Sequence, residues 1–131
     1  MTNYFEKVKN YLLELGYSFT HENEEQALLV ITDLSHGINN LVIDCEGQSV
    51  ILEQFIFELK NYDTNVLLRL LQMSRHLVQG AFVVDENGNK VLYRDTLQLE
   101  NLDLNELKAS IDSLVLAMAE FSNEIISFAR D

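Results

Sequence analysis

The amino-acid sequence predicts an α+β fold in which an antiparallel sheet is packed by helices, in the order α-β-β-β-β-α-β-β-α. Three observations support this prediction. Short apolar runs lie between turn residues, amphipathic segments of helical period flank them, and a seven-residue apolar repeat closes the chain. Strands joined by short turns pair antiparallel, and helices then cover the sheet. The 131 residues, 47% of them hydrophobic, suffice for one continuous core, so we expect a single domain over residues 1–131.

Three segments carry the signals of helices. The first begins with Asn3 and Glu6, which fit a capping box. The second begins near Asp63 or Thr64, both suitable N-caps, and Gly80 is expected to cap its C-terminal end. The third begins at Asp103 and contains no helix breaker. Its apolar stripe has alternating spacings of four and three residues: Leu107, Ile111, Leu114, Met118, Phe121, Ile125 and Phe128.

Six segments are expected to be strands: 17–21, 27–31, 41–45, 50–59, 81–85 and 90–96. The last two are joined at Asn87-Gly88, which predicts a type I′ hairpin turn because both residues tolerate positive φ. The strand over 50–59 is apolar on both faces. One face is expected to hold Val50, Leu52 and Ile56, and the other Ile51, Phe55 and Phe57.

Charge and composition restrict the function. The chain has 21 acidic side chains against 9 Lys and Arg, a formal net charge of -12. Binding to nucleic acid or to an anionic membrane needs clustered cations, so both are disfavoured. The sequence has no apolar run long enough to span a bilayer and no signal-peptide pattern. The lone Cys45 suits a reducing compartment, so we expect a cytoplasmic protein.

No residue pattern indicates catalysis. His21, His36 and His76 fall in a strand, a turn and a helix, without the spacing of metal ligands. Cys45 shares a strand face with apolar residues and has no neighbouring base in the sequence. The acidic segment 85–96 lacks the glycine and glutamate positions of an EF-hand loop. We therefore expect no enzyme activity, no metal and no cofactor.

Two segments carry more apolar residues than one sheet face needs. One is the strand over 50–59, and the other is the last helix, where Leu116 and Ile126 lie outside the main stripe. Such residues are covered either by the same chain or by a second protein chain, most simply in a twofold dimer. We expect a partner or dimer interface to include Ile51, Phe55, Phe57, Leu116, Phe121 and Ile126.

The C-terminal half contains four segments in a fixed order: LLRLLQMS at 67–74, GAFVVD at 80–85, VLYR at 91–94 and LQLENL at 97–102. From Val66 onward these segments resemble the YbjN-like and Tir-chaperone-like families, and the N-terminal half agrees in element order. The resemblance implies the type III secretion chaperone fold. It also implies a small, acidic homodimer that holds an unfolded client segment along apolar grooves.

The leading functional hypothesis is a chaperone-like or adaptor homodimer that binds a client protein as an added strand or in an apolar groove. The alternative is a YbjN-like regulatory domain that contacts a specific folded partner. A third hypothesis is an enzyme or small-ligand binder, for which the sequence offers only the scattered polar residues His21, His76 and Arg94.

Overall fold

The computed structural model describes residues 3–130. In chain order its elements are α1 (Tyr4–Glu14), β1 (Phe19–Asn23), β2 (Leu28–Asp33), the 3₁₀ turn η1 (Leu34–His36), β3 (Ile38–Glu46), β4 (Ser49–Glu58), α2 (Thr64–Arg75), β5 (Ala81–Val84), β6 (Lys90–Gln98) and α3 (Leu104–Arg130). The strands form one antiparallel sheet in the order β1-β2-β3-β4-β6-β5. The predicted α+β fold and the order of helices and strands are confirmed.

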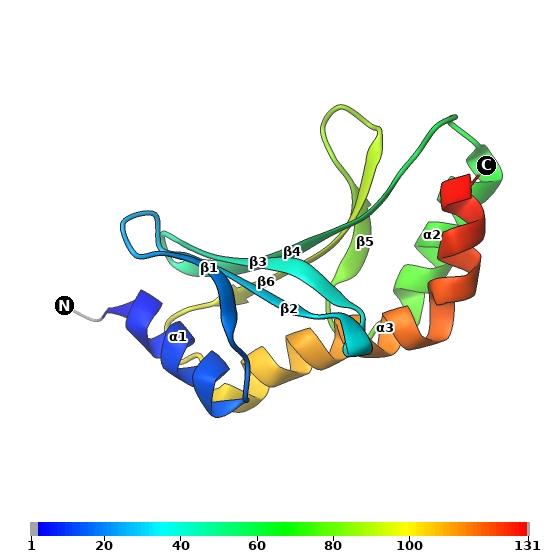
Figure 1. Ribbon diagram of the computed structural model, residues 1–131. Helices are drawn as coiled ribbons and strands as arrows, with labels where there is room; N and C mark the ends of the chain where they lie inside the picture. Colours follow the sequence, from blue (N-terminus) through cyan, green and yellow to red (C-terminus); the bar gives the residue numbers. More distant parts are fainter. Residues whose placement is uncertain (1–2, 131) are drawn as a thin grey trace.

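Helices cover one face of the sheet and leave the other face open (Figure 1). Helix α1 and the first half of α3 lie beneath the sheet, and the second half of α3 turns upward to run beside α2. The first core fills the space under strands β2, β3 and β4. It includes Leu12 of α1, Leu29 and Ile31 of β2, and Leu107 and Ile111 of α3.

A second core lies between α2, the second half of α3 and the β5–β6 hairpin. It includes Leu70, Met73, Phe82, Phe121 and Ile125. Arg69 of α2 ties the two helices together, because its Nε and Nη2 atoms each donate to a carboxylate oxygen of Glu124 at 2.8 Å. Its guanidinium also lies 5.7 Å from the ring centroid of Phe121. The apolar stripe of α3 therefore serves both cores in turn.

The predicted helix starts are confirmed, but one predicted helix end is wrong. Asn3, Asp63 and Asp103 each accept a hydrogen bond from a backbone N–H two or three residues later, at 2.7–3.2 Å. Gly80 does not cap α2, which ends at Arg75. Gly80 lies farther along, immediately before β5, where the backbone has a positive φ of 70°.

The β5–β6 hairpin is confirmed, but its turn is not the predicted type I′ turn. Only Gly88 has a positive φ, 79°, and Asn87 does not. The Gly88 N–H donates to the Asp85 carbonyl at 2.9 Å, and the Asp85 carboxylate accepts from the N–H groups of Asn89 and Lys90, each at 3.0 Å. The N–H donors of Lys90 and Asn89 hold the pKa of Asp85 below its usual value. An aspartate side chain thus completes this turn.

The face predicted for Phe57 is wrong because β4 contains a bulge. Phe55 is opposite Leu92 and Phe57 is opposite Val91, so that Ile56 is an extra residue in β4. Side chains alternate between the faces of a strand, and one extra residue moves every later side chain to the other face. Phe57 is consequently 4% exposed in the second core, whereas Phe55 is 50% exposed on the open face.

The Tyr93 side chain joins β6 to α3 and to the α2–β5 loop. It is fully buried, and its hydroxyl donates to the Ser110 carbonyl at 2.8 Å and lies 3.3 Å from the Gln79 carbonyl. Ser113 of α3 holds the same loop, since its Oγ donates to the Gln79 carbonyl at 2.7 Å and accepts from the Gln79 N–H at 3.0 Å. Burial raises the pKa of Tyr93 to about 12, so the hydroxyl remains a donor.

Replacing Tyr93 with phenylalanine should lower the free energy of unfolding by about 1–2 kcal/mol, because the buried hydrogen bond to the Ser110 carbonyl is lost. Urea denaturation followed by circular dichroism measures this loss. Tyr62→Phe is the matched control, since Tyr62 is 71% exposed and its hydroxyl makes only a long contact of 3.5 Å with the Asn87 carbonyl. Equal losses in the two variants would contradict a structural role for the Tyr93 hydroxyl.

Candidate protein-binding surfaces

The open face of the sheet carries a row of apolar side chains across three neighbouring strands. Phe55 of β4 is opposite Leu92 of β6, which in turn is opposite Val83 of β5. Directly opposed residues on neighbouring strands point to the same face, so the three side chains lie side by side. Ile51 lies farther along the same face of β4, opposite Thr96 of β6. No helix in the described residues covers this face (Figure 1).

This row continues into a hollow between β5 and α2. The hollow has a volume of about 240 Å³, and its lining residues are all apolar: Leu67, Leu70, Leu71, Phe82, Val83 and Val84. Leu71 is 70% exposed, Leu68 is 55% exposed and Val84 is 40% exposed. Strand β5 is also an edge of the sheet, with β6 on one side and no strand on the other in residues 3–130. We refer to Phe55, Leu68, Leu71, Val83, Val84 and Leu92 as the α2–β5 surface.

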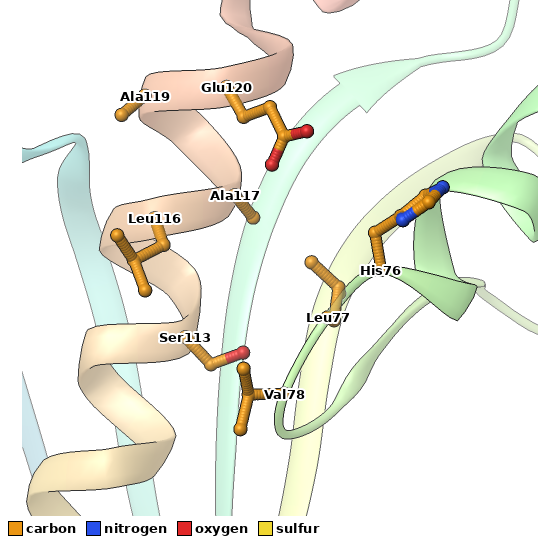
Figure 2. Close-up of a pocket in the computed structure, with 8 residues that line it drawn as sticks. All are labelled: His76, Leu77, Val78, Ser113, Leu116, Ala117, Ala119 and Glu120. Carbon is orange, nitrogen blue, oxygen red and sulfur yellow. The ribbon is translucent and has the colours of Figure 1, made fainter.

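A second apolar surface lies on the side of α3 that faces away from the sheet. There a trough of about 370 Å³ runs between α3 and the α2–β5 loop (Figure 2). Val78 of the loop is 77% exposed and Leu116 of α3 is 60% exposed. Hydrogen bonds of Ser113 to Gln79 fix the loop at this distance from the helix. We call this hollow the α3 trough, lined by His76, Leu77, Val78, Ser113, Leu116, Ala117, Ala119 and Glu120.

The six residues predicted for an interface are not brought together by the fold. Ile51 and Phe55 lie on the open face of the sheet. Leu116 and Ile126, 60% and 48% exposed, lie on the outer surface of α3. The remaining two residues, Phe57 and Phe121, are each 4% exposed within the second core, so the chain itself covers them. An interface role for Ile51, Phe55, Leu116 and Ile126 remains a prediction, and it involves two separate surfaces.

Sequence reasoning missed the exposed leucines of α2. Leu68 and Leu71 are not among the residues predicted for an interface, yet they project from the α2–β5 surface. The available signal was the width of the apolar pattern, because six of the twelve residues of α2 are apolar: Val66, Leu67, Leu68, Leu70, Leu71 and Met73. A helix that packs against one core needs a narrower stripe.

The polar residues considered for catalysis or ligand binding lie on different surfaces. Arg94 pairs with Glu53 at 2.6 Å on the open face of the sheet. His76 lines the α3 trough, and His21 is exposed on β1. In residues 3–130, no group of three or more His, Cys, Asp or Glu side chains is arranged to hold a metal ion. None of the helices in these residues has the length and apolar character needed to cross a membrane.

Cys45 is expected to react slowly with thiol reagents. Burial, with a smaller contribution from Asp44, raises the pKa of the Cys45 thiol to about 11. At pH 8 its thiolate fraction is then roughly a hundredfold below that of an ordinary cysteine. Reaction with a chromogenic disulfide should therefore be about that much slower in the folded protein than in urea. Equal rates in the two conditions would show that the thiol is not held in a buried site.

Comparison with known proteins places the chain in a family. All of residues 1–131 match CesT_Tir_1, so the chain belongs to this family of type III secretion chaperones. No curated protein sequence matches the chain.

Solved structures share the fold at low sequence identity. YbjN from E. coli has a TM-score of 0.69 and 13% identity, with 91% of each chain covered. A chain from the complex of the Yersinia pestis type III secretion chaperone SycH with a stable fragment of YscM2 has a TM-score of 0.62 and 13% identity, covering 96% of this chain and 99% of that chain. A chain of the HopA1–SchA chaperone–effector complex has a TM-score of 0.63 and 14% identity, with 88% and 91% covered.

Proposed function

We propose that this protein is a non-catalytic, chaperone-like binding module that acts as a homodimer in the cytoplasm and holds a segment of a partner protein. The observation that carries the proposal is the α2–β5 surface, in which exposed apolar side chains adjoin an unpaired strand edge. An apolar surface of this kind on an acidic protein favours association with another protein chain. Membership in a secretion-chaperone family supports the same class of function.

The α2–β5 surface is suited to contact with a second copy of the chain. In a twofold dimer each copy presents the same patch, so a patch without net charge avoids repulsion between like charges. Phe55, Leu71, Val84 and the rest of this surface carry no charge, although the chain has a net charge of -12. Arg94 and Glu53, which lie beside it on the open face, neutralise each other. A stable dimer of this type buries about 1,200–2,000 Å² in total.

The similar structures support binding of a different protein in addition to a second copy of the chain. Two of the similar structures are a type III secretion chaperone with a stable fragment of YscM2 and a chaperone–effector complex. For this chain, a partner segment can add to the other sheet edge, β1, or occupy an apolar groove. Capture from a native lysate distinguishes the chaperone function from the regulatory alternative. A client that is unstable without the protein supports chaperoning, whereas a stable folded partner supports regulation.

Sedimentation equilibrium tests the homodimer. We expect a mass of twice 15.1 kDa at micromolar concentrations, because the α2–β5 surface is covered by the second copy. A mass of 15.1 kDa at every concentration would contradict the dimer. It would leave the α2–β5 surface available to a partner protein alone.

A further inference from the structure

The α3 trough has the features of a second, chemically different binding surface. It shares no lining residue with the hollow between α2 and β5. Its two sides come from Leu116 of α3 and Val78 of the loop, both more than half exposed. Small side chains, Ala117 and Ala119, line the helix side and leave about 370 Å³ of space. That volume lies within the usual range of roughly 300–1,000 Å³ for ligand pockets.

Ser113 and Glu120, two polar side chains of the trough, differ in whether they already have a partner within the chain. Ser113 is already occupied, because its hydroxyl bonds to the backbone of Gln79. Glu120 is exposed, and Figure 2 shows its side chain extending from α3 toward the side of His76. In residues 3–130, no Lys, Arg or His side chain forms an ion pair with Glu120. Arg69 is close enough to interact electrostatically with Glu120, but its guanidinium donates to both carboxylate oxygens of Glu124. Glu120 is therefore free to pair with a ligand.

The charges along α3 indicate which ligand fits. Between residues 109 and 129 the charged side chains of the helix are Asp112, Glu120 and Glu124. Asp112 pairs with Lys108 and Glu124 pairs with Arg69, so Glu120 is the acid of this stretch that no ion pair in residues 3–130 neutralises. A second copy packed here in a twofold arrangement would bring a Glu120 carboxylate without an ion pair from each chain into the interface, which disfavours association. A basic ligand gains from the Glu120 carboxylate and from the net charge of -12, which attracts cations over a distance.

We propose that the α3 trough binds a segment of a partner protein that carries a large aliphatic side chain next to a Lys or Arg. The aliphatic side chain fits between Leu116 and Val78, and the cation pairs with Glu120. The stem of a Lys or Arg can also cover apolar surface while its charged end stays in water. This inference rests on the proposed protein-binding function and assigns the partner chemistry to a defined hollow.

A peptide titration tests the proposal on the full chain. The probe is a synthetic peptide of Leu and Arg residues separated by Gly and Ser, and the control peptide has Glu in place of Arg. Backbone amide shifts of the ¹⁵N-labelled protein report the binding site. We expect the basic peptide to shift the amides of residues 76–79 and 113–120. The acidic peptide should cause no comparable shifts.

Two substitutions separate the apolar and the charged contribution. Leu116→Ser should weaken binding of the basic peptide about tenfold, since an aliphatic contact is lost. Glu120→Gln should weaken it about threefold and reduce its salt dependence, since an exposed ion pair is lost. Both residues are exposed, so neither change is expected to impair folding. Leu13→Ser, on the exposed side of α1, is the matched control and should bind like the unchanged protein.

Three results would overturn the proposal: shifts confined to α2 and β5, equal binding of the two peptides, or no binding of the basic peptide. Sedimentation of the same samples shows whether the chain is a dimer. A dimer that fails to bind the peptide contradicts the α3 trough proposal alone. A monomer that binds it at residues 113–120 contradicts the homodimer and supports the trough.

Discussion

Replacing Gly80 with alanine should lower the free energy of unfolding by about 2–4 kcal/mol. Two effects add at this position. Gly80 has φ of 70°, which is costly for a residue with a Cβ atom. A Cβ atom would also lie 2.8 Å from the Tyr93 ring and 2.9 Å from the Arg94 carbonyl oxygen, where neither neighbour has room to move. Chemical denaturation of the purified variant measures the loss.

Gly16→Ala separates the two effects. Gly16 has φ of 92°, but nothing lies within 4 Å of the Cβ position. This variant should lose only about 1–2 kcal/mol from backbone strain. If Gly80→Ala were no more damaging than Gly16→Ala, the close packing of the α2–β5 loop against Tyr93 would be contradicted.

Replacing Leu71 with aspartate should raise the dissociation constant of the homodimer on the order of a hundredfold, because the interface would bury an unpaired charge in place of an apolar contact. Leu71 is 70% exposed in the isolated chain, so the monomer should keep its stability within about 0.5 kcal/mol. Sedimentation equilibrium measures the mass, and thermal unfolding checks the fold.

Leu13→Asp is the matched control for this change, since Leu13 is an exposed leucine on α1, outside the α2–β5 surface. We expect this variant to remain dimeric. Loss of the dimer in both variants would indicate a general effect of added negative charge. Retention of the dimer in Leu71→Asp would exclude Leu71 from the interface.

The parts of the fold that were predictable depend on local chemistry. Asn3, Asp63 and Asp103 act on backbone N–H groups only two or three residues away, so their positions mark the helix starts directly. The seven-residue repeat of α3 is likewise visible in the sequence, and Leu107 and Leu114 are buried as it predicts. The turn at Gly88 was predictable in place but not in type, because the Asp85 side chain decides its geometry.

The candidate surfaces were less predictable because they depend on contacts between distant segments. The bulge at Ile56 arises from the pairing of β4 with β6, and it moves Phe57 from the open face to the core. Phe121 is buried because α2 covers it, with Arg69 above its ring. The α3 trough exists only because the loop before β5 is held against Ser113. None of these pairings has a signal within a short stretch of sequence.

The central claim is that the α2–β5 surface binds a protein chain, and a second copy of this chain is the partner that can be tested directly. Hydrogen–deuterium exchange at two protein concentrations provides this test. The concentrations are chosen by sedimentation to lie above and below the dissociation constant of the dimer. We expect slower exchange at high concentration in residues 67–71 and 81–84, with no change in β1 (Phe19–Asn23) at the opposite edge. Unchanged exchange in 67–71 and 81–84, with protection elsewhere or nowhere, would contradict the central claim.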